Sequence, residues 1–291
     1  MNIGFIGAGK VGKALGLYFK RWGLEIRGYY SRTEASAKSA AELVGCGAFG
    51  TPEALAEECG VIFMTVPDLA LGELDASCAA LVREKRISPH LCWVHVSGAL
   101  ASDCLAELRK EGCPVGSMHP LQSFGEARES GKNLDRALFT VEGTAEAVIL
   151  EILKTTGAKT SRIGTAQKPL YHAGACIVSN YLVTLLESGF RCFEAAGVEQ
   201  EKIFDAVKPL IDSTLGNIRD KGTVNALTGP IARGDYNTLE IHLRSLGEDL
   251  PSELRLYKEM AEKTIDMIAG KTITKEQEQN LLSTMKENWY G

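Results

Sequence analysis

Hydrophobic and polar positions follow two different rhythms along the chain. Up to about residue 164, short aliphatic and β-branched runs alternate with segments of helical spacing. The predicted strands are NIGFIG, LEIRGYYS, VIFMTVP, LCWVHVSG, PVGSMH, ALFTVEG and KTSRIG, and early helices are predicted over 10–22 and 35–44. Strands that are apolar on both faces and separated by helices predict a doubly wound, mostly parallel sheet, which binds ligands at the carboxyl ends of its strands.

After Gly164 the pattern is helical only. The predicted helices cover 169–196, 200–220 with a proline inside, 235–246, 252–269 and 274–289. The sequence therefore predicts an α/β domain over 1–164, followed by an all-α C-terminal domain over 165–291.

Helix ends carry recognisable signals. Pro169 suits the first turn of its helix, Asp235 is a predicted N-cap, and Thr274 with Gln277 forms a predicted capping box.

The first loop has the spacing G-x-G-x-x-G, made by Gly7, Gly9 and Gly12, directly between a predicted strand and a predicted helix. In this context the first glycine makes a tight turn, the second admits a pyrophosphate and the third lets helix and strand pack closely. We therefore predict a Rossmann-type dinucleotide site, in which Lys10 and Val11 belong to the cofactor-binding loop.

The end of the second strand indicates which dinucleotide is preferred. An NAD site places an acidic residue about 20 residues after the glycines, whereas this chain has Ser31 and Arg32. A hydroxyl and a bidentate cation suit a 2′-phosphate, so we predict NADP(H) as the cofactor. The alternative interpretation of Arg32 is a solvated surface arginine with no role in cofactor binding.

Three further strand ends, TVPD, HVSG and SMHPLQSF, are expected at the same sheet edge. Val66 and Pro67 are predicted to wall the cofactor, and Ser97 to hydrogen-bond nicotinamide or substrate. His119 follows a strand and carries an imidazole able to donate a proton near neutral pH. A lone histidine is more often structural, and His95 is predicted to lie inside its strand.

A polar stripe runs along the first helix of the second domain. Its members, Lys168, His172, Cys176, Ser179 and Asn180, recur at spacings of three and four on an otherwise apolar helix. Lys168 stands at the amino end, where the helix dipole disfavours an ammonium and lowers its pKa. The stripe is either catalytic or satisfied by internal hydrogen bonds or by a second subunit, since this helix is also the natural homodimer contact.

Composition excludes several classes of partner. The net charge of −5 and 24% charged residues describe an ordinary globular protein and favour a small-molecule substrate over nucleic acid or a membrane. The longest uncharged run, 169–186, is short for a membrane span and is expected to be a buried helix. Eight cysteines without a C-x-x-C pair, and no signal peptide pattern, predict reduced thiols in the cytoplasm.

Other site chemistries have less support. The sequence lacks Walker, G-x-S-x-G and H-E-x-x-H motifs, and no cysteine and histidine spacing indicates a metal site. Arg233, in a glycine-rich loop, could reach either an acidic substrate group or a partner chain.

The motifs IGFIGAGKVG, TVPD, HVSGA, MHPLQSF, YHAGACIVSNY and LTGPIARGD occur in this order along the whole chain. In this respect the chain resembles a family of NADP oxidoreductases that join a Rossmann-like domain to a helical C-terminal domain of unknown function. That family is akin to pyrroline-5-carboxylate reductase, ketopantoate reductase and the β-hydroxyacid dehydrogenases. It has no agreed substrate.

The wider resemblance implies roles for individual residues. The segment from Gly164 through Lys168 to His172 is similar to the dehydrogenase pattern G-x-x-x-K-x-x-x-N, which implies Lys168 as proton donor, although His172 replaces the asparagine. HVSGA and MHPLQSF resemble prephenate dehydrogenase segments that bring a serine and a histidine to the nicotinamide, which favours Ser97 and His119.

The sequence thus predicts hydride transfer between NADPH and a small C=O or C=N substrate bound between the domains, with His119, Lys168 or His172 as proton donor. The alternative is a catalytically inactive NADP-binding sensor or scaffold, because the Lys-x-x-x-Asn pair is incomplete.

Overall fold

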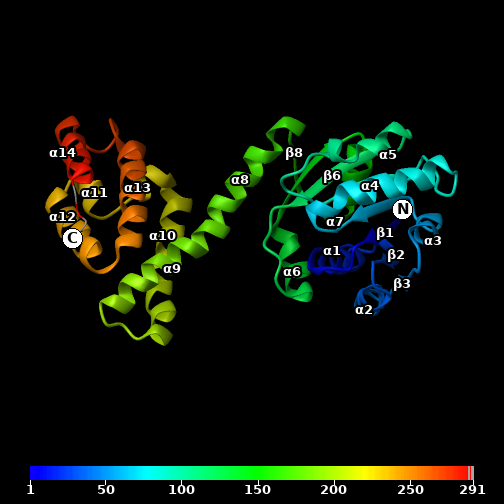
Figure 1. Ribbon diagram of the computed structural model, residues 1–291, viewed down its shortest axis with the longest axis horizontal. Coiled ribbons are helices and arrows are strands. Elements are labelled where there is room, and N and C mark those ends of the chain that lie inside the picture. The colour runs from blue at the N-terminus through cyan, green and yellow to red at the C-terminus, as the bar shows by residue number, and fades with distance from the viewer. Residues whose placement is uncertain (288, 290–291) are drawn as a thin grey trace. The chain divides into compact units, whose positions relative to one another are not determined.

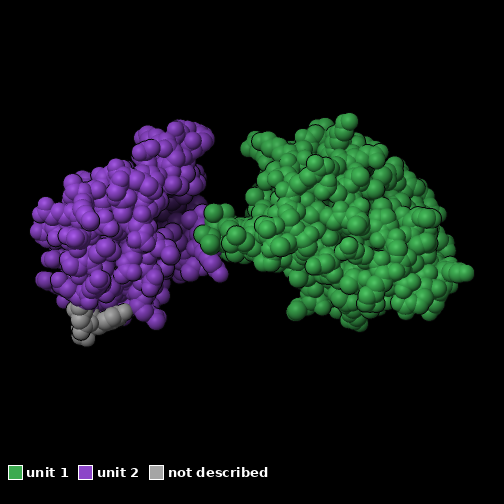
Figure 2. Space-filling model, turned by 90° about the horizontal axis from the view of Figure 1, so that it is seen from above, with its two compact units in different colours: residues 1–180 green, residues 181–291 purple. Residues whose placement is uncertain are grey.

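The structure is a computed structural model that describes residues 1–287 and 289. The chain divides into two compact units, residues 1–180 and 181–291 (Figure 2). The first unit holds the sheet and the helix that follows it, and the second is helical (Figure 1). That residues 1–164 form the dinucleotide-binding domain, and residues 165–291 the domain for substrate binding and dimerisation, stays a prediction.

The first unit is built on an eight-stranded sheet with strand order β3-β2-β1-β4-β5-β6-β7-β8. Its strands are β1 (Asn2–Ile6), β2 (Glu25–Tyr30), β3 (Gly47–Ala48), β4 (Val61–Met64), β5 (Cys92–His95), β6 (Val115–Pro120), β7 (Leu138–Gly143) and β8 (Lys159–Arg162). Every neighbouring pair is parallel except β6 and β7, which are antiparallel. The predicted doubly wound α/β fold is confirmed.

Helices cover both faces of this sheet (Figure 1). They are α1 (Lys10–Arg21), α2 (Glu34–Val44), α3 (Pro52–Glu57), α4 (Asp68–Arg83), α5 (Ala106–Lys110), α6 (Ala127–Asn133) and α7 (Glu146–Thr156), with short 3-10 turns η1 (Ser102–Cys104), η2 (Leu134–Arg136) and η3 (Thr165–Gln167). The helix α8 (Lys168–Val178) follows the last strand and is buried only at Lys168. Alternate residues of each central strand enter two separate cores: Phe63 packs with α1 and α2, whereas Ile62 and Met64 pack with α3 and α4. Burial on both faces explains why these strands read as continuous apolar runs.

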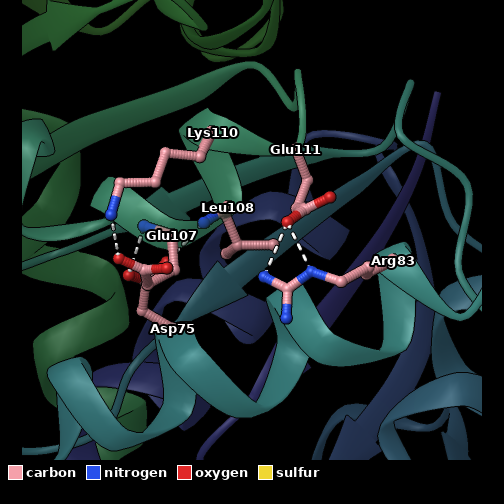
Figure 3. Close-up of polar contacts among 6 residues, drawn as sticks. All are labelled: Asp75, Arg83, Glu107, Leu108, Lys110 and Glu111. Carbon is pink, nitrogen blue, oxygen red and sulfur yellow. Dashed lines mark hydrogen bonds and ion pairs between the residues drawn. The ribbon is translucent and has the colours of Figure 1, made fainter.

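A buried carboxylate joins α4 to α5 (Figure 3). Asp75 is 3% exposed and accepts hydrogen bonds from the backbone amides of Glu107, at 2.9 Å, and Leu108, at 3.0 Å. Burial raises the pKa of Asp75, and the two amide bonds oppose that rise. The carboxylate thus satisfies the open amino end of a short helix. Nearby, Arg83 and Glu111 form an ion pair at 2.7 Å (Figure 3).

The second unit contains α9 (Asn180–Ala195), α10 (Gln200–Ala226), α11 (Pro230–Arg233), α12 (Tyr236–Asp249), α13 (Pro251–Ile268) and α14 (Lys275–Lys286). Leu239, Leu243, Leu254, Ile265 and Leu281 form its apolar core. The predicted caps are confirmed: Asp235 accepts a bond from the Thr238 amide, and Thr274 and Gln277 form a capping box.

Two helix predictions need correction. The helix expected over 169–196 breaks at Ser179, whose φ of −122° and ψ of −68° separate α8 from α9. The helix expected to end at Asp220 extends to Ala226 across a kink at Gly222, where φ is +74°. Glycine reaches this positive φ without the strain that a side chain would cause.

The expectation that the uncharged run forms a buried helix is wrong for the single chain. In α8 only Lys168 is buried, and α9 has no buried residue. The physical reason is that neither unit by itself covers side chains such as Leu170 and Val183, which are 77% and 69% exposed. By length and composition, Thr165–Ala195 could cross a membrane, but a single apolar helix is weak support because ordinary core helices pass the same test.

Candidate functional site

The glycine loop between β1 and α1 has the geometry of a phosphate-binding turn. Gly7 has a φ of +109°, and a β-carbon on it would lie 2.7 Å from the Thr65 carbonyl oxygen. A β-carbon on Gly12 would lie 2.5 Å from Thr65 Oγ1. Gly7 therefore excludes a side chain on both conformational and steric grounds, and Gly12 on steric grounds.

Gly9 has a different role, because an added β-carbon there would meet nothing within 4 Å. Gly9 is the N-cap of α1, and no side chain caps that helix. The amino end of α1 is therefore open to an incoming group, as a pyrophosphate requires.

Threonine and tyrosine residues that the sequence reading missed hold this loop in place. Thr65, at the end of β4, donates its hydroxyl to the Gly7 carbonyl at 2.8 Å. Tyr29 of β2 donates its hydroxyl to the Gly12 carbonyl at 2.8 Å, and a β-carbon on Gly16 would collide with that hydroxyl. Thr65 opens the motif TVPD at a predicted strand end, and this position was the one sequence feature that could have indicated its contact with the glycine loop.

A cavity of about 560 Å³ opens beside the loop. Six predicted cofactor residues line it: Gly7, Gly9, Ser31, Arg32, Val66 and Pro67. Ser36, Glu73 and Ser77 are lining residues that were not predicted, whereas Lys10, Val11 and Gly12 are not among those that line it. Arg32 is exposed and forms no ion pair with another described residue, so its guanidinium is available to an anion.

A second group of polar residues surrounds Lys168, at the start of α8. Lys168 is 1% exposed, and its Nζ donates to the Ser97 carbonyl at 2.8 Å and to Ser117 Oγ. Burial lowers the pKa of Lys168 to about 8. The ammonium therefore binds the start of α8 to the loop after β5 and to the middle of β6.

A buried carboxylate lies close to this ammonium. Glu142 of β7 is 5% exposed and accepts hydrogen bonds from the Ser102 amide and hydroxyl, each at 2.7 Å, and from Thr165 Oγ1 at 3.2 Å. The negative charge of Glu142 raises the pKa of Lys168 and so offsets part of the lowering that burial causes. Glu142 could not be predicted from the sequence, because a single acidic residue in a strand is usually exposed.

The hydroxyl of Ser97 is committed to the loop after β5. Ser97 Oγ donates to Asp68 Oδ2 at 2.8 Å and accepts from the amides of Ala99 and Leu100. Ser97 therefore shapes the loop that presents Gly98.

His119 and His172 lie together above Gly98. Their rings are perpendicular, with centroids 6.0 Å apart. A β-carbon on Gly98 would lie 2.5 Å from His172 Nδ1 and 2.8 Å from His119 Nε2. His172 Nδ1 is buried without a hydrogen-bond partner, and burial lowers the pKa of His119 to about 4. Both imidazole rings thus pack closely against Gly98, a position that leaves no room for a side chain.

The remaining predicted residues do not contact Gly98 in the way that this pair does. Asn180 begins α9, beyond the break, and is exposed. His95 is fully buried inside β5, where burial lowers its pKa to about 3. Arg233 lies 3.9 Å from Asp235 and is otherwise exposed. Within residues 1–287 and 289, no group of three or more metal-ligating side chains is placed to hold a metal ion.

The depressed pKa of Lys168 predicts a pH-dependent stability. Lysine in the unfolded chain titrates near 10.4, so between about pH 8 and 10.4 the unfolded state binds more protons and the free energy of unfolding rises with pH. The expected rise is about 3 kcal/mol, present in the wild type and absent in Lys168→Met. Urea unfolding at several pH values measures it, with Lys154→Met, an exposed lysine of α7, as control. Equal pH slopes in wild type and Lys168→Met would contradict the burial of this charge.

Comparisons with known proteins agree with the architecture. The Rossmann-like domain family matches residues 1–120, and a domain of unknown function, DUF2520, matches residues 137–264. No curated protein matches the chain.

Solved structures share the fold over nearly their full length. A provisionally named NADP oxidoreductase from Bacteroides fragilis is 24% identical, with a TM-score of 0.71 over 90% of this chain and 97% of that one. A reductive aminase from Aspergillus terreus, solved with NADPH and ethyl-5-oxohexanoate, is 14% identical, with a TM-score of 0.63 over 95% and 97%. The pyrroline-5-carboxylate reductase of Streptococcus pyogenes is 13% identical, with a TM-score of 0.64 over 99% of both chains. The chain therefore joins a Rossmann-like domain to a domain of the DUF2520 family.

Proposed function

We propose that the protein is an NADP-dependent oxidoreductase that transfers hydride between NADPH and a small C=O or C=N substrate. The observation that carries this proposal is a single sheet edge that holds an open glycine loop beside a cavity, and the paired rings of His119 and His172 beside Gly98. The aminase and reductase that share the fold act on such groups, which supports the assignment.

The residues at the loop fit a dinucleotide. Gly9 and the uncapped start of α1 would hold the pyrophosphate, and Val66 and Pro67 would wall the cavity. Bound nicotinamide would supply the hydride, while His119 would hydrogen-bond the substrate heteroatom. Reduction of small ketones, imines and 2-oxo acids, followed by NADPH absorbance, tests the proposal.

Arg32 is proposed to select NADPH over NADH. In Arg32→Asp, loss of a charge-assisted bond to the 2′-phosphate should weaken NADPH about 10- to 100-fold and leave NADH nearly unchanged. Calorimetric titration with both nucleotides measures the effect. Arg109→Asp, at an exposed arginine of α5, changes the net charge equally and should alter neither affinity. Equal wild-type affinities for the two nucleotides would refute the assignment.

A sensor or scaffold that binds NADP without turnover is the second candidate. The observation in its favour is that Lys168, which the resemblance implies as proton donor, is buried and donates two of its three N–H groups to Ser97 and Ser117. Tight NADPH binding with no turnover of any substrate would favour this alternative.

We propose a cytoplasmic homodimer that covers the exposed apolar side chains of α8 and α9, such as Leu170, Ile177 and Val183. All eight cysteines are free, as a reducing compartment requires. A sedimentation mass of one chain, 31.4 kDa, would exclude the dimer.

A further inference from the structure

The cavity beside the glycine loop has two walls that differ in their hydrogen-bonding groups. The glycine loop follows β1, and the strand order places β2 on one side of β1 and β4 on the other. One wall comes from the end of β2 and carries Arg32. The other comes from α4, which follows β4, and carries Leu69, Glu73 and Ser77. Because these three residues recur at spacings of four, they form one stripe of α4 that lines the cavity.

The wall from β2 presents hydrogen-bond donors. Arg32 is the only basic residue among those that line the cavity, and its guanidinium has N–H groups but no acceptor atom. Its proposed ligand, the 2′-phosphate, accepts hydrogen bonds through its oxygens.

The wall from α4 presents hydrogen-bond acceptors. Glu73 is the only acidic residue among those that line the cavity, is exposed, and forms no ion pair with another described residue. An ionised carboxylate can only accept. Ser77 donates its hydroxyl to the Glu73 carbonyl at 2.8 Å, so its oxygen retains only lone pairs for a ligand. This wall therefore suits a ligand group that carries N–H donors and no negative charge.

In NADPH, the adenine base meets this requirement. The carboxylate of Glu73 would repel the pyrophosphate and the 2′-phosphate, which the proposed function places at Gly9 and Arg32. The ribose is bonded to that 2′-phosphate and so stays near Arg32. Adenine carries a neutral exocyclic amine with two N–H donors, and its flat ring needs an apolar contact. Leu69, which is 100% exposed, and the half-buried Leu74 offer that contact on either side of Glu73 along the helix.

We propose that Glu73 accepts a hydrogen bond from the exocyclic amine of the cofactor's adenine, and so selects adenine over a purine that has a carbonyl at the same ring position. This inference rests on the proposed NADP-dependent function, and it makes Glu73 a specificity-determining residue on the wall opposite Arg32.

Calorimetric titration with NADP⁺ and deamino-NADP⁺ tests this role without any substrate. Deamino-NADP⁺ contains hypoxanthine, which has an oxygen acceptor where adenine has the amine, and the two nucleotides are otherwise identical. The wild type should bind NADP⁺ about tenfold more tightly than deamino-NADP⁺. In Glu73→Gln the side-chain amide can either accept or donate, so the ratio of the two Kd values should fall to about one.

Glu57→Gln is the matched control. Glu57 is an exposed residue of α3 that does not line the cavity, and its substitution changes the net charge equally. Glu57→Gln should therefore keep the wild-type ratio. Arg32→Asp should weaken both nucleotides and also keep the ratio, because both carry the 2′-phosphate.

The outcomes separate this inference from the proposed function. Tight binding of both nucleotides with equal affinity by the wild type, or a preference that survives in Glu73→Gln, would overturn the role of Glu73 and leave the NADP site intact. A wild-type protein that binds neither nucleotide would overturn the proposed function and this inference together.

Discussion

Replacing His119 with asparagine is expected to lower kcat about 100- to 1,000-fold while leaving the Kd for NADPH unchanged. His119 Nδ1 lies 3.0 Å from the Tyr171 hydroxyl and its Nε2 lies beside Gly98, and the shorter asparagine side chain cannot place a polar atom at both positions. The measurement pairs NADPH oxidation kinetics with calorimetric titration of the nucleotide.

The control for this variant is His242→Asn. His242 has the same edge-to-face tyrosine partner, with ring centroids 5.9 Å apart, but it belongs to the second unit. His242→Asn should retain wild-type kcat. If His119→Asn also turns over at the wild-type rate, His119 has no part in the chemistry.

Gly7→Ala is expected to abolish measurable nucleotide binding and to lower the free energy of unfolding by about 1–3 kcal/mol. Alanine is strained at a φ of +109°, and its β-carbon would lie 2.7 Å from the Thr65 carbonyl oxygen, which is backbone and cannot move aside easily. Urea unfolding and titration with NADPH measure the two effects.

Two other glycines make this test selective. Gly9→Ala meets nothing within 4 Å, so it should keep the wild-type stability and weaken only the nucleotide, whose pyrophosphate needs that space. Gly72→Ala, in α4, also meets nothing within 4 Å and should leave binding unchanged. Wild-type binding by Gly7→Ala would show that the loop does not hold the nucleotide.

Local pattern was sufficient for the sheet and most helices because burial on both faces leaves a direct trace in sequence. All seven predicted strands are present. The eighth strand, β3, was not predicted because its two residues are too few to produce a hydrophobic pattern. The break at Ser179 was missed because no proline or glycine marks it. The exposure of α9 was missed because apolar composition does not reveal whether a single chain can cover a helix.

The sequence by itself determined the class of the fold, the turn at Gly7 and Gly12, and the helix caps, because each depends on residues that are neighbours along the chain. Only the tertiary structure decided which polar side chains meet. His119 bonds Tyr171 across 52 positions and Lys168 bonds Ser97 across 71. Such pairs follow from strand order and helix packing, which no local spacing in the sequence records.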